Sequence, residues 1–253
     1  MSGIHSVSIV GTGNVAHHLG KALRDSGVTV TSIFGRNQSA ALVLADKLDC
    51  ASVSSLTELH GELILLCVSD DAISDLVKEF SDDRRIAYTS GSVPLSALPK
   101  KGELGVFYPL QTFSKHRDVD LSKVPFLIEA RSEKFQSELM QLASKISEKV
   151  VYANSQDRLH YHISAVFVNN FVNHLFALGK AHNDEHGLDW EVLKPLIHET
   201  VAKINSLEPL AAQTGPALRN DQDTIHRHLG ELSGIPKEVY TLITQSIQQS
   251  SKK

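Results

Sequence analysis

A pair of glycines between an apolar strand and a helix is the feature that most constrains this chain. Residues 7–11 read VSIVG, and a helical pattern over residues 15–27 follows. Gly11 permits a tight turn, Gly13 lets the backbone approach a pyrophosphate, and Ala16 lets the helix pack closely on a sheet. A helix N-terminus presents N–H groups and partial positive charge to an anion. This context predicts a dinucleotide site, and a tight turn that binds nothing is the alternative.

Short apolar runs alternate with helical patterns up to about residue 153. The expected strands cover residues 7–11, 28–35, 62–70, 84–92, 103–113, 125–130 and 149–153. The expected helices cover residues 15–27, 38–49, 70–80 and 133–146. This alternation predicts an α/β fold with a doubly wound, mostly parallel Rossmann sheet.

The strand-like runs stop near residue 154, and the remaining segments read as helices. They cover residues 155–187, 189–207, 221–234 and 236–253. Pro195 either lies inside the second segment or opens a new helix. We therefore expect an NADP-binding Rossmann domain over residues 1–153 and an all-α substrate and dimerisation domain over residues 154–253. The long first segment is apolar over most of its circumference, so a second subunit or the Rossmann domain must cover it.

Composition excludes several classes of partner. The net charge of −4 gives no reason to expect nucleic acid or a membrane surface. No apolar run approaches the roughly 18–20 residues that cross a bilayer. The first residues lack a basic segment followed by an apolar run, so we expect no secretory signal. Cys67 lies inside an apolar run, and with two cysteines in all, a reducing cytoplasm is the expected compartment.

The end of the second strand discriminates between the two nicotinamide cofactors. An NAD site usually has an acidic residue there to bind the ribose hydroxyls. This chain reads FGRNQS, with Arg36 in place of the acid and Asn37 and Ser39 beside it. A guanidinium can hold a 2′-phosphate through two hydrogen bonds, so we expect NADP. A solvated surface arginine is the alternative.

Polar residues follow the third apolar strand at its carboxyl end, where ligands bind in open α/β sheets. Val68 and Ser69 are expected along the nicotinamide side of the cofactor. Asp70 and Asp71 are expected to be N-caps of the next helix.

Two further strand-end loops carry hydroxyl and amide groups. The run TSGS, residues 89–92, either holds the nicotinamide amide or a substrate through hydroxyls such as that of Ser90, or is a glycine turn. Gln111 and Thr112 lie between aromatics in a loop fixed by Pro109. They either orient a substrate or take part in ordinary loop packing.

The helical half also carries polar candidates. Asn170, Asn173 and His174 share one helix face by their spacing, and they either line a polar cleft or join helices in the core. Arg219 follows a glycine–proline turn and either clamps a substrate carboxylate or pairs with Asp221 to cap a helix.

Thirteen histidines raise the question of a metal site. His182 and His186 are four residues apart, but the chain has no H-E-x-x-H pattern. We expect scattered solvated histidines and no metal.

Sequence motifs carry a resemblance to known proteins. The N-terminal half resembles the NADP-binding domains of pyrroline-5-carboxylate reductase and of deazaflavin-dependent NADP oxidoreductases. The whole chain resembles a family of Rossmann-like NADP oxidoreductases with a helical C-terminal domain, related to the 6-phosphogluconate dehydrogenase superfamily, whose helical domain often builds a dimer. The motifs that carry the resemblance are GTGNVA, CVSDDAI, YTSGSVPLSAL, FYPLQTFS and TGPALRNDQDTIHRHL. Tyr88 and Tyr108 depart from the family, which usually has histidine at both positions.

These patterns predict an NADP-dependent oxidoreductase that transfers a hydride between NADP(H) and a small carbonyl, imine or hydroxy substrate, which we expect to be anionic. An NADP-binding sensor or scaffold without catalytic activity is the alternative. Our candidates are His174 for acid–base chemistry, Asn170 and Gln111 for orientation, and Arg219 for the anionic group. We also expect a homodimer. The expected cofactor-binding residues are Gly11, Thr12, Gly13, Asn14, Val15, Arg36, Asn37, Val68, Ser69 and Ser90.

Overall fold

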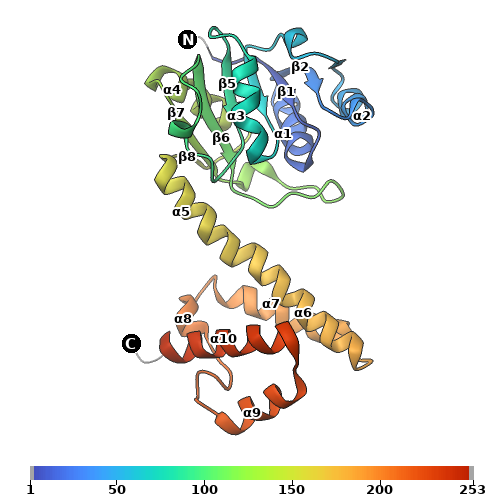
Figure 1. Cartoon of the computed structure of the whole chain (residues 1–253), viewed down its shortest axis with the longest axis vertical. Coiled ribbons are helices and arrows are strands. Elements are labelled where there is room, and N and C mark those ends of the chain that lie inside the picture. The colour runs from blue at the N-terminus through green and yellow to red at the C-terminus, as the bar shows by residue number, and fades with distance from the viewer. Residues whose placement is uncertain (1–2, 251–253) are drawn as a thin grey trace. The chain divides into compact units, whose positions relative to one another are not determined.

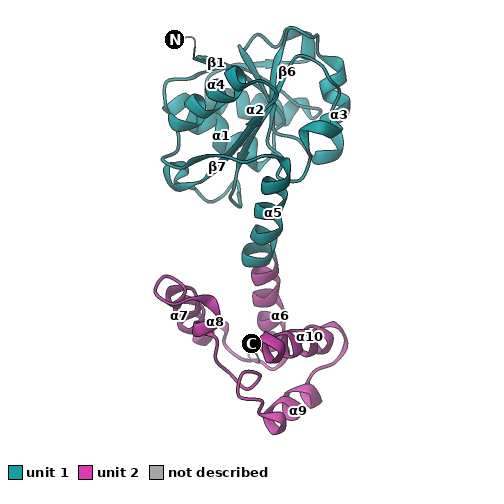
Figure 2. Ribbon diagram, turned by 90° about the vertical axis from the view of Figure 1, so that its left-hand side faces the viewer, with its two compact units in different colours: residues 1–170 teal, residues 171–253 magenta. Residues whose placement is uncertain are grey.

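The chain forms two compact units, residues 1–170 and residues 171–253 (Figure 2). The structure is a computed structural model, and it describes residues 3–250. The expected domain boundary at residue 153 follows the last strand, whereas the two units divide at residue 170, inside the π-helical segment Val166–Phe171.

Unit 1 is built on one eight-stranded sheet (Figure 1). The strands are β1 (Ser6–Val10), β2 (Thr29–Phe34), β3 (Ala51–Val53), β4 (Leu63–Leu66), β5 (Arg85–Tyr88), β6 (Glu103–Pro109), β7 (Phe126–Ala130) and β8 (Val150–Tyr152). Their order is β3-β2-β1-β4-β5-β6-β7-β8, and every neighbouring pair is parallel except β6 with β7. The order reverses between β1 and β4, which is the switch point where ligands bind in doubly wound sheets. The predicted fold class is confirmed.

Helices cover both faces of this sheet. The helical elements up to residue 144 are α1 (Asn14–Asp25), α2 (Gln38–Leu48), η1 (Leu56–Glu58), α3 (Asp70–Glu79), η2 (Leu95–Ala97), η3 (Leu121–Lys123) and α4 (Glu133–Ser144). Buried side chains of α1, α2 and α4 pack on one face, and those of α3 and η2 pack on the other. Figure 2 shows α3 on the opposite side of the sheet from α1 and α2. β3 was not expected from the sequence, because its three residues, ASV, form no apolar run.

All described elements after residue 154 are helical, as expected. They are α5 (Ser155–Ala165), the π-helical segment Val166–Phe171, α6 (Val172–Glu185), η5 (Trp190–Leu193), α7 (Lys194–Lys203), α8 (Pro209–Ala212), α9 (Gln222–Glu231) and α10 (Gly234–Ser250). Gly187 follows α6 with a φ of 65°, and Pro195 lies in the first turn of α7, so it opens a helix. Residues 251–253 of the expected last helix lie outside the described part. Within residues 3–250, no helix combines the length and the apolar character that a bilayer crossing requires.

Candidate functional site

The glycine-rich turn joins the end of β1 to the start of α1. Gly11 has a φ of 119°, and a Cβ atom there would lie 2.1 Å from the carbonyl oxygen of Cys67, so no other residue fits without a backbone shift. The N–H of Gly11 donates to the carbonyl of Phe34 over 2.8 Å. Gly13 is the N-cap of α1, and a Cβ there would meet no heavy atom within 4 Å. Ala16 is fully buried. The turn therefore leaves open space in front of a helix N-terminus.

Arg36 lies beside this turn, just past the end of β2. A Cβ on Gly35 would lie 2.7 Å from the methyl group of Thr12, so the two loops touch. Asn37 caps α2, because its Oδ1 accepts from the N–H of Ala40 over 3.0 Å. The side chain of Arg36 is exposed and has no hydrogen-bond or ion-pair partner within residues 3–250. Its guanidinium is thus available next to the turn.

Positive charge gathers around the first two turns of α1. Burial is the main cause that lowers the pKa of His17, and the nearby side chains of Lys115, Lys47 and His18 lower it further. The two lysines place positive charge near His17, and positive charge favours a phosphate-bearing ligand.

The loops after β4 and β5 meet at the same edge of the sheet. The hydroxyl of Ser92 donates to the carboxylate of Asp70, and the hydroxyl of Thr89 donates to the carbonyl of Leu66 over 3.2 Å. Ser69 is exposed and is the N-cap of α3, although its side chain makes no capping bond. Our expectation that Asp70 and Asp71 would be N-caps was wrong. The extended backbone of Ser69 starts the helix one residue earlier, so both carboxylates lie in the first turn and face the positive end of the helix dipole.

Ser90 holds the turn that follows β5. It is buried, and its hydroxyl oxygen accepts from the N–H groups of Ser92 and Val93 over 3.1 and 3.0 Å. This geometry favours the glycine-turn interpretation of residues 89–92. Val68 is half-buried against the core on the same side of the sheet as α3.

The loop after β6 turns back onto α1. The amide of Asn14 donates to the carbonyl of Phe113 over 2.7 Å, and Nε2 of His18 lies 3.0 Å from the carbonyl of Ser114. Val15 packs against the core beneath this contact. Gln111 is exposed, and its Oε1 accepts from the N–H of the next residue over 2.8 Å. The loops that follow β1, β4, β5 and β6 therefore converge on one sheet edge.

A tyrosine–histidine pair at this edge was not anticipated. The hydroxyl of Tyr108, one residue before the end of β6, lies 3.1 Å from Nδ1 of His162 on α5. Both side chains are half-buried. A Cβ on Gly91 would lie 2.8 Å from Nδ1 of His162 and 2.9 Å from the hydroxyl of Tyr108. By contrast, Tyr88 is fully buried, and its hydroxyl donates to the carbonyl of Val93 over 2.8 Å.

The comparisons with known proteins agree with this geometry. Residues 6–87 match a family described as NADP oxidoreductase coenzyme F420-dependent, and residues 124–247 match a domain of unknown function (DUF2520). No curated protein matches the chain. The crystal structure of a proposed NADP oxidoreductase from Bacteroides fragilis is 35% identical, with a TM-score of 0.90, and the match covers 97% of this chain and 98% of that one.

The chain belongs to the NADP oxidoreductase family of this Bacteroides fragilis protein.

Membership makes the protein a pyridine-nucleotide-dependent oxidoreductase, and it favours an enzyme over a sensor without activity. Two more distant structures share the fold. A reductive aminase from Aspergillus terreus, in complex with NADPH and ethyl 5-oxohexanoate, is 13% identical with a TM-score of 0.71 and coverages of 99% and 94%. A pyrroline-5-carboxylate reductase from Streptococcus pyogenes is 12% identical with a TM-score of 0.63 and coverages of 98% and 98%.

Three candidates of the helical half remain predictions for this oxidoreductase. The side chains of Asn170, His174 and Arg219 are exposed. Asp221 caps α9 by accepting from the N–H of Thr224 over 3.1 Å. Hydrogen bonding to Thr224 lowers the pKa of Asp221. The described ion pairs do not include one between Arg219 and Asp221, so the cap forms without the arginine.

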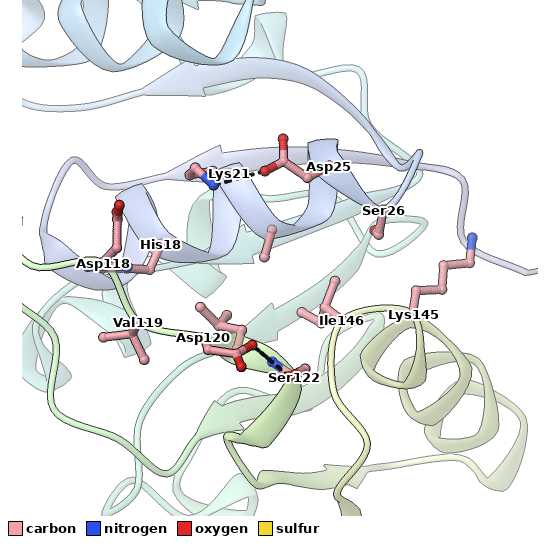
Figure 3. Close-up of a pocket in the computed structure, with 12 residues that line it drawn as sticks. His18, Lys21, Asp25, Ser26, Asp118, Val119, Asp120, Ser122, Lys145 and Ile146 are labelled. Atoms are coloured by element: carbon pink, nitrogen blue, oxygen red, sulfur yellow. Dashed lines mark hydrogen bonds and ion pairs between the residues drawn. The ribbon is translucent and has the colours of Figure 1, made fainter.

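The oxidoreductase has a cavity of about 620 Å³ beside α1, away from the glycine-rich turn (Figure 3). Three of its charged side chains, those of Lys21, Asp25 and Asp120, have partners. Lys21 bonds to Asp25 over 3.0 Å, and Asp120 accepts from the N–H of Ser122 over 3.1 Å (Figure 3). No residue of the glycine-rich turn lines this cavity.

Unit 2 brings together residues that sequence reasoning had set aside. His182, Glu185 and His186 each offer one ligand atom, and these atoms lie within 4.8 Å of one another. Glu185 and His186 are exposed, and Nδ1 of His186 lies 2.9 Å from the carbonyl of His182. His182 and Glu185 also line a mostly apolar cavity of about 680 Å³ within the same unit.

Proposed function

We propose that this oxidoreductase transfers a hydride between NADP(H) and a small carbonyl, imine or hydroxy substrate. The observation that carries the choice of NADP is the exposed guanidinium of Arg36. It has no partner within the described residues and lies next to an open glycine-rich turn. A 2′-phosphate would give this guanidinium a charged partner, whereas a ribose hydroxyl would not. When bound, NADPH supplies the hydride for the reaction.

The substrate class is supported by what the structural relatives act on. The reductive aminase holds a keto ester beside NADPH, and the pyrroline-5-carboxylate reductase is named for a cyclic imine that bears a carboxylate. An imine reductase is also among the similar folds. A carbonyl or imine carbon is the electrophile that accepts a hydride in each of these cases. The description of the N-terminal family adds coenzyme F420, a deazaflavin, as a second candidate hydride partner.

NADPH and NADH titrations followed by nucleotide fluorescence test the cofactor. The unmodified protein should bind NADPH more tightly than NADH, by about 10-fold to 150-fold if the guanidinium contributes about 1.5–3 kcal/mol to a phosphate. Arg36→Asp should abolish or reverse this preference. Lys134→Asp is the control, because it makes the same change of charge on an exposed residue of α4. Equal affinities of the unmodified protein for the two nucleotides would refute the choice of NADP. Adding reduced coenzyme F420 with NADP then tests the deazaflavin.

We further propose a homodimer built by the helical half. Within residues 171–250, the buried apolar side chains are Ala217 and Ile225. Phe167 and Val168 are 61% and 73% exposed, and many large apolar side chains of unit 2 are also exposed. An apolar surface of this extent is typical of an interface. Light scattering at micromolar concentration should give about twice the 27.7 kDa of one chain, and Val168→Asp should weaken the association. A 27.7 kDa species would contradict the dimer.

Arg219 supports an anionic substrate, because its exposed guanidinium has no recorded partner among the described residues. Asn170, His174 and Gln111 are the proposed polar groups that orient the substrate with it. Arg219→Ala should weaken substrate binding by about 1.5–3 kcal/mol and leave NADPH affinity unchanged. A lower melting temperature with unchanged substrate binding would instead assign Arg219 a structural role.

A further inference from the structure

Helix α5 is anchored to the sheet by a buried charge pair. Arg158 is 1% exposed, and its guanidinium contacts the carboxylate of Glu129 on β7. It also donates to the carbonyl of Val93 over 2.6 Å. The hydroxyl of Ser155 donates to the same carboxylate over 2.8 Å. The first turns of α5 are therefore fixed to the strand-end loops of unit 1.

This anchor determines where His162 lies. His162 follows Arg158 by four residues, so the two side chains leave the same face of α5. Arg158 faces the loop after β5, and His162 accordingly meets Tyr108 at the end of β6, with 3.1 Å between Nδ1 and the hydroxyl. The rings meet edge to face at 69°.

Gly91 keeps a space in which the pair can meet. A methyl group on Gly91 would lie less than 3 Å from both the imidazole nitrogen and the phenolic oxygen. The contact therefore requires a glycine in the loop after β5, the strand between β4 and β6. The pair lies at the carboxyl edge of the sheet, on the same edge as Ser69 and the glycine-rich turn.

The surroundings keep the phenol of Tyr108 protonated. Burial raises the pKa of Tyr108, the carboxylate of Asp70 on α3 raises it further, and Arg158 on α5 lowers it. The net direction is upward, so the hydroxyl is an acid that holds its proton at neutral pH. His162 is half-buried and can exchange protons with solvent.

We propose that Tyr108 and His162 are the proton relay of this oxidoreductase. The proposal rests on the proposed function, since it supplies the proton that accompanies a hydride. Tyr108 donates its phenolic proton to the oxygen or nitrogen of the substrate as the carbon is reduced. The phenolate then takes a proton from Nδ1 of His162, and the imidazole takes one up from solvent. One hydride and one proton thereby reach the substrate, and the relay returns to its starting state.

Other side chains at this edge of the sheet fit the role of proton donor less well. Tyr88 is sealed in the core with its hydroxyl bonded to Val93. Cys67 is buried, so its thiol is less accessible to a substrate than the half-buried phenol of Tyr108. Gln111 has no proton to give at neutral pH.

The test measures Tyr108→Phe and His162→Gln. Its two controls, Tyr161→Phe and His160→Gln, lie on α5, the helix that carries His162. NADPH binding is measured by fluorescence, and NADPH oxidation is followed with three probes, each at saturating NADPH. The probes are pyruvate with ammonium, 1-pyrroline, and ethyl 5-oxohexanoate with ammonium. Tyr108→Phe should lower kcat about 100-fold to 10,000-fold and leave the NADPH Kd within about twofold. His162→Gln should lower kcat by about tenfold or more and remove an ionisation from the pH profile. The controls should match the unmodified protein.

A second readout does not depend on turnover. The ¹⁵N resonance of Nδ1 of His162, assigned through His162→Gln, should move in Tyr108→Phe and stay in place in Tyr161→Phe. If Tyr108→Phe retains more than half of the unmodified kcat, or if the resonance does not move, the relay is refuted. If the protein turns over none of the probes, the resonance alone tests the coupling of Tyr108 to His162. If the unmodified protein does not bind NADPH, the proposed function is refuted, and the resonance still tests that coupling.

Discussion

Removal of Arg158 tests whether buried charge holds helix α5 against the sheet. The guanidinium is 1% exposed and Glu129 is 14% exposed, so neither charge is well solvated in the folded protein. Arg158→Met leaves the carboxylate of Glu129 without its cation, and the hydroxyl of Ser155 remains as its hydrogen-bond donor. Breaking a buried ion pair from one side costs about 3–5 kcal/mol. We expect a loss of that size in the free energy of unfolding.

The cost should depend on which partners are present. Glu129→Gln alone should also be destabilising, because it leaves the guanidinium of Arg158 buried and unpaired. The double variant should cost less than the sum of the two single variants, since it leaves no lone buried charge. Lys134→Met is the matched control, because it removes an exposed cation, and its effect should stay within about 0.5 kcal/mol.

Thermal and urea unfolding measure these differences. At roughly 2–4 °C per kcal/mol for a chain of this size, Arg158→Met should lower Tm by about 6–20 °C. The ¹⁵N resonance of His162 should move as well, because the helix that carries it loses its anchor. A loss below about 1 kcal/mol in Arg158→Met, or simple additivity in the double variant, would refute the reasoning.

Two further predictions concern the turn and the thiols. Gly11→Ala should abolish NADPH binding and retain the circular dichroism spectrum, because the added methyl group meets the carbonyl oxygen of Cys67 at 2.1 Å. Gly27→Ala is the control, because Gly27 has a φ of 81° and open space around it. This variant should lose stability and still bind NADPH. Burial raises the pKa of Cys67 from 9.0 to about 12, and burial with Asp49 raises that of Cys50 to about 11. Both thiols should resist a disulfide reagent at pH 8 until the protein unfolds. Because folding raises both thiol pKa values, the thiols' contribution to the free energy of unfolding is complete below pH 9 and is lost as the pH rises toward 12. Unfolding curves measured at alkaline pH would show this loss. A free energy of unfolding that rises above pH 9 would contradict it.

Much of the fold could be predicted because its determinants are local. A strand, two glycines and a helix that are adjacent in the chain predicted the turn at Gly11. The positive φ of Gly11 explains why this residue is a glycine. The alternation of apolar runs with helical patterns predicted the parallel sheet, since parallel strands need crossover connections, which are usually helices. The carboxyl ends of parallel strands share one edge, so the convergence of the loops after β4, β5 and β6 followed as well.

The sequence was less informative where two local interpretations compete. It favoured N-cap positions for Asp70 and Asp71, but the extended backbone at Ser69 starts the helix one residue earlier. It left the run around Ser90 open between a ligand contact and a turn, and the hydroxyl bonds to two N–H groups of its own loop. Side chains that can bond either to a ligand or to their own backbone cannot be assigned from spacing alone.

Tertiary structure alone decided which groups meet at the candidate site. Tyr108 and His162 are 54 positions apart, and no period or motif links them. Arg158 belongs to a residue type that is usually exposed, and its burial depends on a carboxylate from β7 and a carbonyl from the loop after β5. Local sequence determines backbone conformation, because it acts within a few residues. The pairing of distant charges and hydrogen-bonding groups depends on how strands and helices pack, and only the folded chain brings those groups within a few ångströms of each other.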